Sequence, residues 1–250
     1  MSLADSAGVP WEGRSFHQNP LAGDDGSAPP LLLAALRGFR AGELGEAEVL
    51  DAARDVRLLV PLIAVRGDEG VGAHGQLVDK TQELSIVTVA GPDGRTVLPA
   101  FTSVEALAHW NPEARPIPID SRRVALAAAS EQTDLVVLDP TSDTEFTLRR
   151  PAVKALAVGE PWRPAYADPE VLAAVEASTR GDDRIRGVRL LSGDPHARLA
   201  GPEIIVELAL VPGLDQDAVD AVVRRVGEAW SVDDLIAERV DSIAISLVAG

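Results

Sequence analysis

The stretch LPAFTSVEALAHWNP, residues 98–112, carries the strongest local structural signals in this chain. Its first residues are typical of the end of a strand. Thr102 and Glu105 then predict a capping box, in which a hydroxyl and a carboxylate accept hydrogen bonds from each other's backbone. Pro112 has no backbone donor and disfavours a helical conformation at Asn111. The stretch therefore predicts a strand, a turn and a short capped helix.

The predicted helix places Phe101 at its entry and Trp110 at its exit, in a chain with few aromatic residues. Helical spacing directs Val104, Leu107, Ala108 and Trp110 towards the interior. Two interpretations of Trp110 stay open. It either packs with Phe101 in the core, or it lines a groove beside the segment NPEARP, where a partner peptide docks.

Outward from this stretch, hydrophobic periodicity predicts an alternation of helices and strands. Pro61 indicates that its strand lies at a sheet edge or contains a bulge. The sequence GPDG at 91–94 predicts a hairpin turn, and residues 66–80 a polar loop. We expect helices at 29–40, 44–56, 122–132, 150–160, 170–180, 215–230 and 232–239, and strands at 57–65, 83–90, 95–101, 134–140, 145–150, 185–192, 203–211 and 242–248.

This pattern predicts an α+β fold made of two small mixed modules. We expect a mobile arm at 1–29, an N-terminal domain at 30–160, a proline-rich linker at 161–169, and a C-terminal β-β-α-β sandwich within 170–250. The arm contains Trp11 and Phe16, which either pack back on the body or form a docking peptide.

Composition excludes several classes of function. The chain has no cysteine, so it forms no disulfide or thiolate metal site, and its net charge of −16 argues against nucleic acid or an anionic membrane as a partner. No run of 18 apolar residues predicts a membrane span, and the first residues have no secretory pattern. We expect a cytoplasmic protein.

No motif in the sequence predicts a catalytic or cofactor-binding site. GVGAHG at 70–75 matches a dinucleotide fingerprint, but no long apolar helix follows it, so a loop is favoured. The four histidines lie far apart, which argues against a metal site. SGDPH at 192–196 resembles a chance trio in a turn. We expect no enzyme activity, no cofactor and no metal.

Two arginine pairs are candidate binding residues. Arg122 with Arg123, at a helix start, and Arg149 with Arg150, at a strand end, form either a clamp for a ligand carboxylate or a solvated face. The favoured function is a non-catalytic adaptor that binds an unknown protein partner. The alternative is a module that binds an amino acid or related metabolite between the two domains. A homodimer through an edge strand near Pro61 is a third hypothesis.

Three stretches together resemble a known family: LLVPLIAV (58–65), the segment from QELSIV to VVLDP (82–140), and RRPAVKALAVGEPW (149–162). They are similar to SseB family proteins, the enhanced serine sensitivity proteins, of the actinobacterial type. VLPAFTS, the W-x-P and VLDP are the specific marks, and residues 183–250 match only loosely. The resemblance implies an α+β fold in two modules. It implies no enzymatic activity and no catalytic residues.

Overall fold

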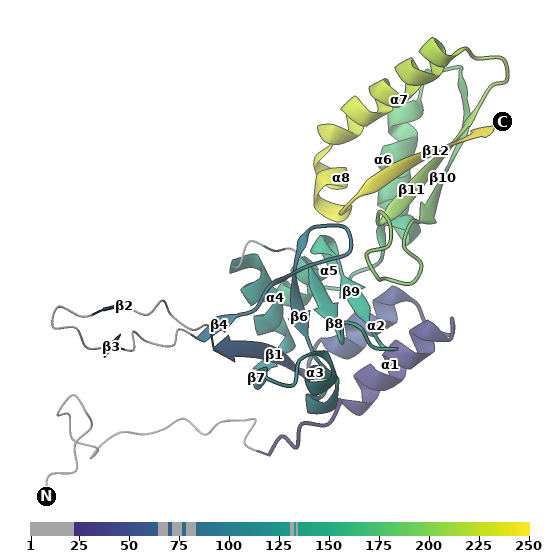
Figure 1. The fold of residues 1–250 in the computed structure, drawn as a ribbon. Coiled ribbons are helices and arrows are strands. Elements are labelled where there is room, and N and C mark those ends of the chain that lie inside the picture. The colour runs from purple at the N-terminus through teal and green to yellow at the C-terminus, as the bar shows by residue number, and fades with distance from the viewer. Residues whose placement is uncertain (1–22, 65–69, 72–76, 79–83, 131–132, 134) are drawn as a thin grey trace, which may run out of the picture.

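The computed structural model describes residues 23–250 except 65–69, 72–76, 79–83, 131–132 and 134. Figure 1 shows two groups of elements: α1 to α5 with β1 to β9 in one, and α6 to α8 with β10 to β12 in the other. Each group has its own cluster of buried apolar side chains. The chain is therefore a mixed α+β protein, as the sequence predicts.

The helices of the N-terminal module begin and end close to their expected positions. Pro30 lies in the first turn of α1, where its missing donor costs nothing, and Leu32 and Leu36 bury one face. Gly159 ends α5 with a φ of 77°, a left-handed conformation that suits glycine. These helices are α1 (Pro30–Arg40), α2 (Glu46–Ala53), α3 (Val104–Trp110), α4 (Ser121–Ser130) and α5 (Arg150–Val158).

In the described part of this module the strands form three sheets, in the orders β4-β1-β7, β5-β6-β8-β9 and β2-β3. In the four-stranded sheet β6 and β8 are parallel, and the other neighbours are antiparallel. The strands are β1 (Arg57–Ala64), β2 (Gly70–Val71), β3 (Leu77–Val78), β4 (Leu84–Ile86), β5 (Val89–Ala90), β6 (Thr96–Ala100), β7 (Arg115–Asp120), β8 (Val136–Leu138) and β9 (Phe146–Leu148).

Three expectations about these strands are corrected. Residues 83–90 form two strands in different sheets, β4 and β5, instead of one. The loop expected at 66–80 contains the paired strands β2 and β3. The strand with Pro61 is not an edge: β1 pairs with β7 on one side and with β4 and Phe101 on the other. A homodimer through the strand that contains Pro61 therefore has no free edge to use.

The missing donor of Pro61 is accommodated because β1 changes partner at this point. Leu59 exchanges two backbone hydrogen bonds with Phe101, each 2.8 Å, and the pairing with β4 begins only at Leu62. Residues two apart direct their backbone groups to the same side of a strand. Pro61 thus directs its nitrogen into the interval between the two partners.

The C-terminal module begins with a short 3₁₀ turn, η1 (Ala165–Ala167), inside the segment expected as a linker. Ala165 is buried in the C-terminal core, whereas Trp162 packs against the N-terminal core. The sheet order is β10-β11-β12, with β11 and β12 parallel. Its elements are α6 (Pro169–Thr179), β10 (Ile185–Ser192), β11 (Ile204–Leu210), α7 (Gln216–Ser231), α8 (Asp234–Arg239) and β12 (Ile243–Ala249).

Residues 23–29, the end of the expected arm, contact the body of the protein. The guanidinium of Arg57 donates to Asp24 at 2.6 Å and to the carbonyl of Ser27 at 2.7 Å, and the backbone amide of Val104 donates to the carbonyl of Gly26. These contacts tie the chain to the start of α3. Trp11 and Phe16 lie outside the described residues.

Candidate functional site

Helix α3 positions Trp110, and its start differs from the capping box that the sequence predicts. The N-cap is Ser103, whose hydroxyl accepts a hydrogen bond from the amide of Ala106 at 3.0 Å. Thr102 lies one residue earlier and bonds elsewhere, so the predicted pairing with Glu105 is wrong. Thr102 and Ser103 both have a hydroxyl that can cap a helix, and Glu105, three residues after Thr102, favoured the wrong one of the two.

Thr102 instead joins two of the sequence marks, VLPAFTS and VLDP. Its amide donates to Oδ1 of Asp139 at 2.7 Å, and its hydroxyl donates to Oδ2 at 2.8 Å. Burial raises the pKa of Asp139 above its ordinary value, although these hydrogen bonds oppose the shift. The contact holds the start of α3 against the end of β8.

The exposed face of α3 is larger than predicted. Leu107 is buried, but Val104 and Ala108 are exposed, so the expectation that both face inward is wrong. Trp110 is half-buried and packs on Phe101, with 5.3 Å between ring centroids and a tilt of 44°. One part of the indole packs against Phe101, as the core interpretation predicts, and another part is accessible. The groove that the accessible part lines includes no residue of NPEARP, and docking of a peptide stays a prediction.

The accessible part of Trp110 lines a groove of about 350 Å³ on one face of the four-stranded sheet. Alternate strand residues point to opposite faces. Leu98, Val136 and Leu138 therefore join the main core, while Val97 and Val137 face the groove. The full lining is Val89, Ala90, Gly91, Pro92, Val97, Pro99, Trp110, Val137, Pro140, Thr141, Glu145, Thr147, Arg198 and Leu199. This Trp110 groove is mainly apolar.

Two hydrogen-bonding groups in the groove lack partners within the described part of the chain. The hydroxyl of Thr147 has no hydrogen-bond partner, although the residue is buried and only 3 % exposed. The indole N–H of Trp110 donates to no described residue, whereas that of Trp230 donates to Ser178 at 2.8 Å. Buried polar groups are normally paired, so the Thr147 hydroxyl is an exception in the wall of this groove.

The wall of the groove also concentrates unusual backbone. Thr141 and Leu199 line it with φ values of 67° and 55°, and their neighbours Asp139 and Ala197 have φ values of 45° and 48°. A left-handed conformation is uncommon outside glycine, and such residues often cluster at functional sites. At the rim, Glu145 accepts from the amide of Thr141 at 2.6 Å.

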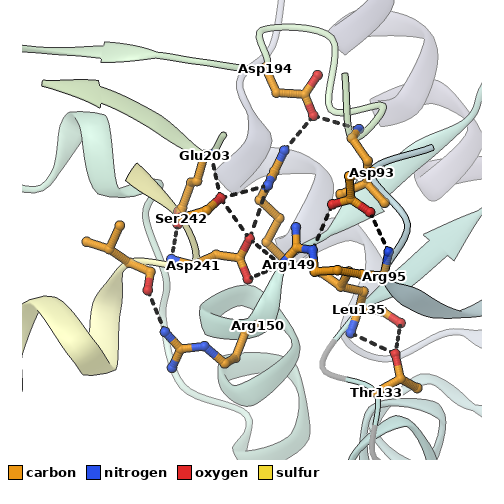
Figure 2. A network of polar contacts seen from close by, with 12 residues as sticks. Asp93, Arg95, Thr133, Leu135, Arg149, Arg150, Asp194, Glu203, Asp241 and Ser242 are labelled. Carbon is orange, nitrogen blue, oxygen red and sulfur yellow. Dashed lines mark hydrogen bonds and ion pairs between the residues drawn. The ribbon is translucent and has the colours of Figure 1, made fainter. Parts of the chain in front are cut away.

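A cluster of polar side chains around Arg149, here called the Arg149 joint, connects the two modules (Figure 2). Its guanidinium forms ion pairs with Asp194 at 2.8 Å and Asp241 at 3.1 Å. The carbonyl of Gly201 accepts from it at 2.7 Å, and the hydroxyl of Ser242 lies at 3.3 Å. The Arg149 side chain is only 6 % exposed, and acceptors of its own chain bind both of its terminal amino groups.

Two acids beside the Arg149 joint are held partly protonated near neutral pH. Burial and the nearby charge of Asp241 raise the pKa of Glu203 to about 7, against hydrogen bonding from the Asp241 amide. Burial and the charge of Glu203 raise the pKa of Glu46 to about 7 as well. Glu203 is 5 % exposed and Glu46 is half-buried, so Glu203 is the more constrained of the two.

The other arginines of the predicted pairs do not join this centre. Arg150 donates to the carbonyl of Val240, so it points away from Arg149 and the two form no common clamp. Arg122 and Arg123 are exposed, and Arg122 lies 3.6 Å from Asp55. Of the four arginines, Arg149 and Arg150 thus bind groups within the protein, whereas Arg122 and Arg123 lie on the surface.

A cleft of about 360 Å³ lies between α5, the 160–163 segment and α8. Its walls carry paired charges: Lys154 with Glu238 at 2.5 Å, and Arg239 with Asp168 at 3.0 Å. Trp162 lines its floor. Within the described residues, no cluster of three metal-ligating side chains was found, and no helix has the length and apolarity needed to cross a membrane.

Comparison with protein families identifies the N-terminal module. Residues 32–155 match the model of the SseB protein N-terminal domain, which covers about half of the chain. The chain therefore belongs to the SseB family, as the sequence marks indicate. The match includes β1, the groove-lining strands, α3 and Arg149. No curated protein and no solved structure matches the chain.

Proposed function

We propose that this SseB family protein is a non-catalytic, cytoplasmic protein-binding module that holds an extended apolar segment of a partner in the Trp110 groove. The observation that carries the proposal is the unpartnered hydroxyl of Thr147 in an apolar groove. A binding site needs a few polar groups that orient the ligand among apolar walls. Thr147 and Trp110 supply one such group each.

The chemistry of the groove suits a peptide. An extended segment presents backbone carbonyls and amides between its side chains, and aromatic-lined grooves are a recurrent place to bind such segments. The Trp110 indole donates to a carbonyl, and the Thr147 hydroxyl donates or accepts. Val97, Val137 and Leu199 offer apolar contact to the side chains between.

The test is selection of peptides from a displayed random library on the full chain, followed by affinity measurement of the selected peptides. We expect Trp110→Ala to weaken binding at least tenfold, and Thr147→Val to weaken it several-fold without loss of folding. Trp162→Ala, in the other cleft, is the matched control and leaves binding unchanged. Peptides whose affinity does not depend on Trp110 or Thr147 contradict the proposal.

The alternative function is a module that binds an amino acid or related metabolite between the two domains. The observation that favours it is the cleft lined by Trp162, Lys154 and Arg239, which lies between α5 and α8. A ligand that binds only the folded state raises the melting temperature. A panel of serine, related amino acids and nucleotides tests this directly, with Trp162→Ala as the variant that removes the shift. No shift at millimolar concentration contradicts this alternative.

A further inference from the structure

The edges of the sheets differ in how they are protected. An edge strand presents unpaired backbone groups, and proteins usually block it with charges, prolines, bulges or covering loops. Strand β7 carries Pro116 and Pro118. The amide of Thr147 in β9 donates to the carbonyl of Ala197, so a loop covers that edge. Strand β10 has a register shift after Ile185 and exposes arginines.

Strand β12 has none of these protections. Among the described residues it pairs with β11 alone, so its other side is a sheet edge. Its sequence IAISLVA contains no charge and no proline over seven residues. Leu247 and Val248 are 41 % and 37 % exposed. An uncharged strand of high β propensity with one free side is suited to pair with another strand.

The backbone of β12 shows which groups are available. The carbonyl of Ser242 accepts from Ile204, and the amide of Gly250 donates to Leu210, so both residues direct their backbone groups towards β11. Residues two apart share a direction, which leaves the backbone groups of Ile243, Ile245, Leu247 and Ala249 on the free side.

We propose that the partner of this edge is a second copy of the chain, and that two β12 strands pair antiparallel about Ser246. In this register Ile245 lies opposite Leu247 of the second copy, and each such pair exchanges two hydrogen bonds. Ser246 lies opposite itself in a pair that is not hydrogen-bonded, with Cα atoms about 4.5 Å apart. The pairing joins the two sheets and keeps their helix-covered faces on one side.

Charge favours a second copy at this surface over other surfaces of the molecule. The chain has a net charge of −16, so two copies that meet through most of their surface bring acidic side chains together. Strand β12 brings no charge into the pair. The shared register also keeps small side chains opposite larger ones on the open face, with Ala244 facing Val248 of the second copy.

The experiment measures the mass of the full chain by light scattering over a range of concentrations up to the solubility limit. We expect a mass twice the 26.3 kDa of one chain. Ser246→Lys and Ser246→Asp each place like charges opposite one another in the pair. We therefore expect each variant alone to be a monomer, with half the mass of the wild-type dimer. Gln216→Lys adds the same charge on the exposed start of α7 and stays dimeric.

Mixing the two Ser246 variants distinguishes this pairing from a general loss of folding. Lysine and aspartate then lie opposite each other across the pair, and the dimer returns in the mixture. A wild-type chain that stays at 26.3 kDa at every concentration overturns the proposal. A dimer that both Ser246 variants retain overturns it as well, because the two copies then meet elsewhere.

Discussion

The Arg149 joint and the Trp110 groove each combine residues of both modules, and they differ in how their polar groups are paired. At the joint, the buried guanidinium finds two carboxylates, a carbonyl and a hydroxyl within its own chain. In the groove, the buried hydroxyl of Thr147 finds no partner among the described residues. The guanidinium at the joint is bound within its own chain and has a structural role, although Oε1 of Glu203 beside it is also buried without a partner. The Thr147 hydroxyl differs because it belongs to the wall of a groove.

The largest effect is expected from breaking the joint. Arg149→Ala leaves Asp194 buried without a cation and leaves Asp241 with Arg95 alone, and loss of one partner of a buried ion pair costs about 3–5 kcal/mol. Urea unfolding measures the free energy of unfolding of the variant. The control Arg123→Ala removes an exposed arginine, and we expect a change within about 0.5 kcal/mol. Equal losses in the two variants contradict a structural role for Arg149.

The joint also predicts a pH dependence of stability. The pKa of Glu203 is about 7 in the folded chain against an ordinary 4.5, so the folded state binds this proton more tightly than the unfolded state. The free energy of unfolding therefore falls as the pH rises from about 4.5 to about 7, and the loss is complete above that range. The depressed pKa of Asp182, about 2, acts only in more acidic solution.

Urea unfolding in buffers between about pH 5 and pH 8 measures this slope, which we expect to total a few kcal/mol. Glu203→Gln keeps an acceptor for the amide of Asp241 and has no proton to release, so its slope is smaller. Half-buried Glu46 and buried Asp139, whose pKa values are also raised, contribute with the same sign. Stability that rises with pH across this window contradicts the assignment of Glu203.

A smaller effect is expected at the helix that carries Trp110. Ser103→Ala removes the N-cap of α3 and lowers the free energy of unfolding by about 1 kcal/mol. Glu105→Ala tests the rejected capping box, and we expect a change below about 0.5 kcal/mol. Thermal unfolding of the two variants side by side decides between the caps. A larger loss for Glu105→Ala restores the box that the sequence predicts.

The smallest effect has the opposite sign and concerns the groove. Thr147→Val replaces the unpartnered hydroxyl by a methyl group of similar shape, so we expect the free protein to gain up to about 1 kcal/mol. The Ser242 hydroxyl at the joint is the matched comparison, because it is hydrogen-bonded to Arg149 and to the amide of Glu203. We expect Ser242→Ala to destabilise the protein. Chemical unfolding of both variants provides the measurement. A destabilised Thr147→Val means that the hydroxyl already has a partner.

Local signals in the sequence predicted most elements, because periodicity and turn chemistry act over a few residues. The 91–94 turn closes as expected, with Gly94 at a φ of 82°, and the C-terminal β-β-α-β order is confirmed. The prediction failed at Pro61 because a missing donor matters only on the side where a partner strand lies. It failed at 83–90 because one hydrophobic stretch serves two sheets.

The candidate site was less accessible to sequence analysis. The partners of Arg149 are Asp194 and Asp241, 45 and 92 positions further along the chain, so no local pattern indicates burial. Trp110 was found because aromatic residues are rare here. Thr147 was missed because the lack of a hydrogen-bond partner for its hydroxyl depends on its surroundings in the folded protein. The signal that was present is the alternation of β9, which turns Thr147 away from buried Phe146 and Leu148.

The loop between β10 and β11 has a consequence for synthesis of the chain. Its Ala197 belongs to the N-terminal core, and its Leu199 packs with Val97 and Val137. A ribosome needs roughly 3–10 s to extend the chain from Thr147 to Ala197. During that interval the nascent N-terminal module has an open strand edge and an uncovered apolar surface. The SseB domain is therefore translated several seconds before the residues that complete it, and its apolar surface is exposed for that time.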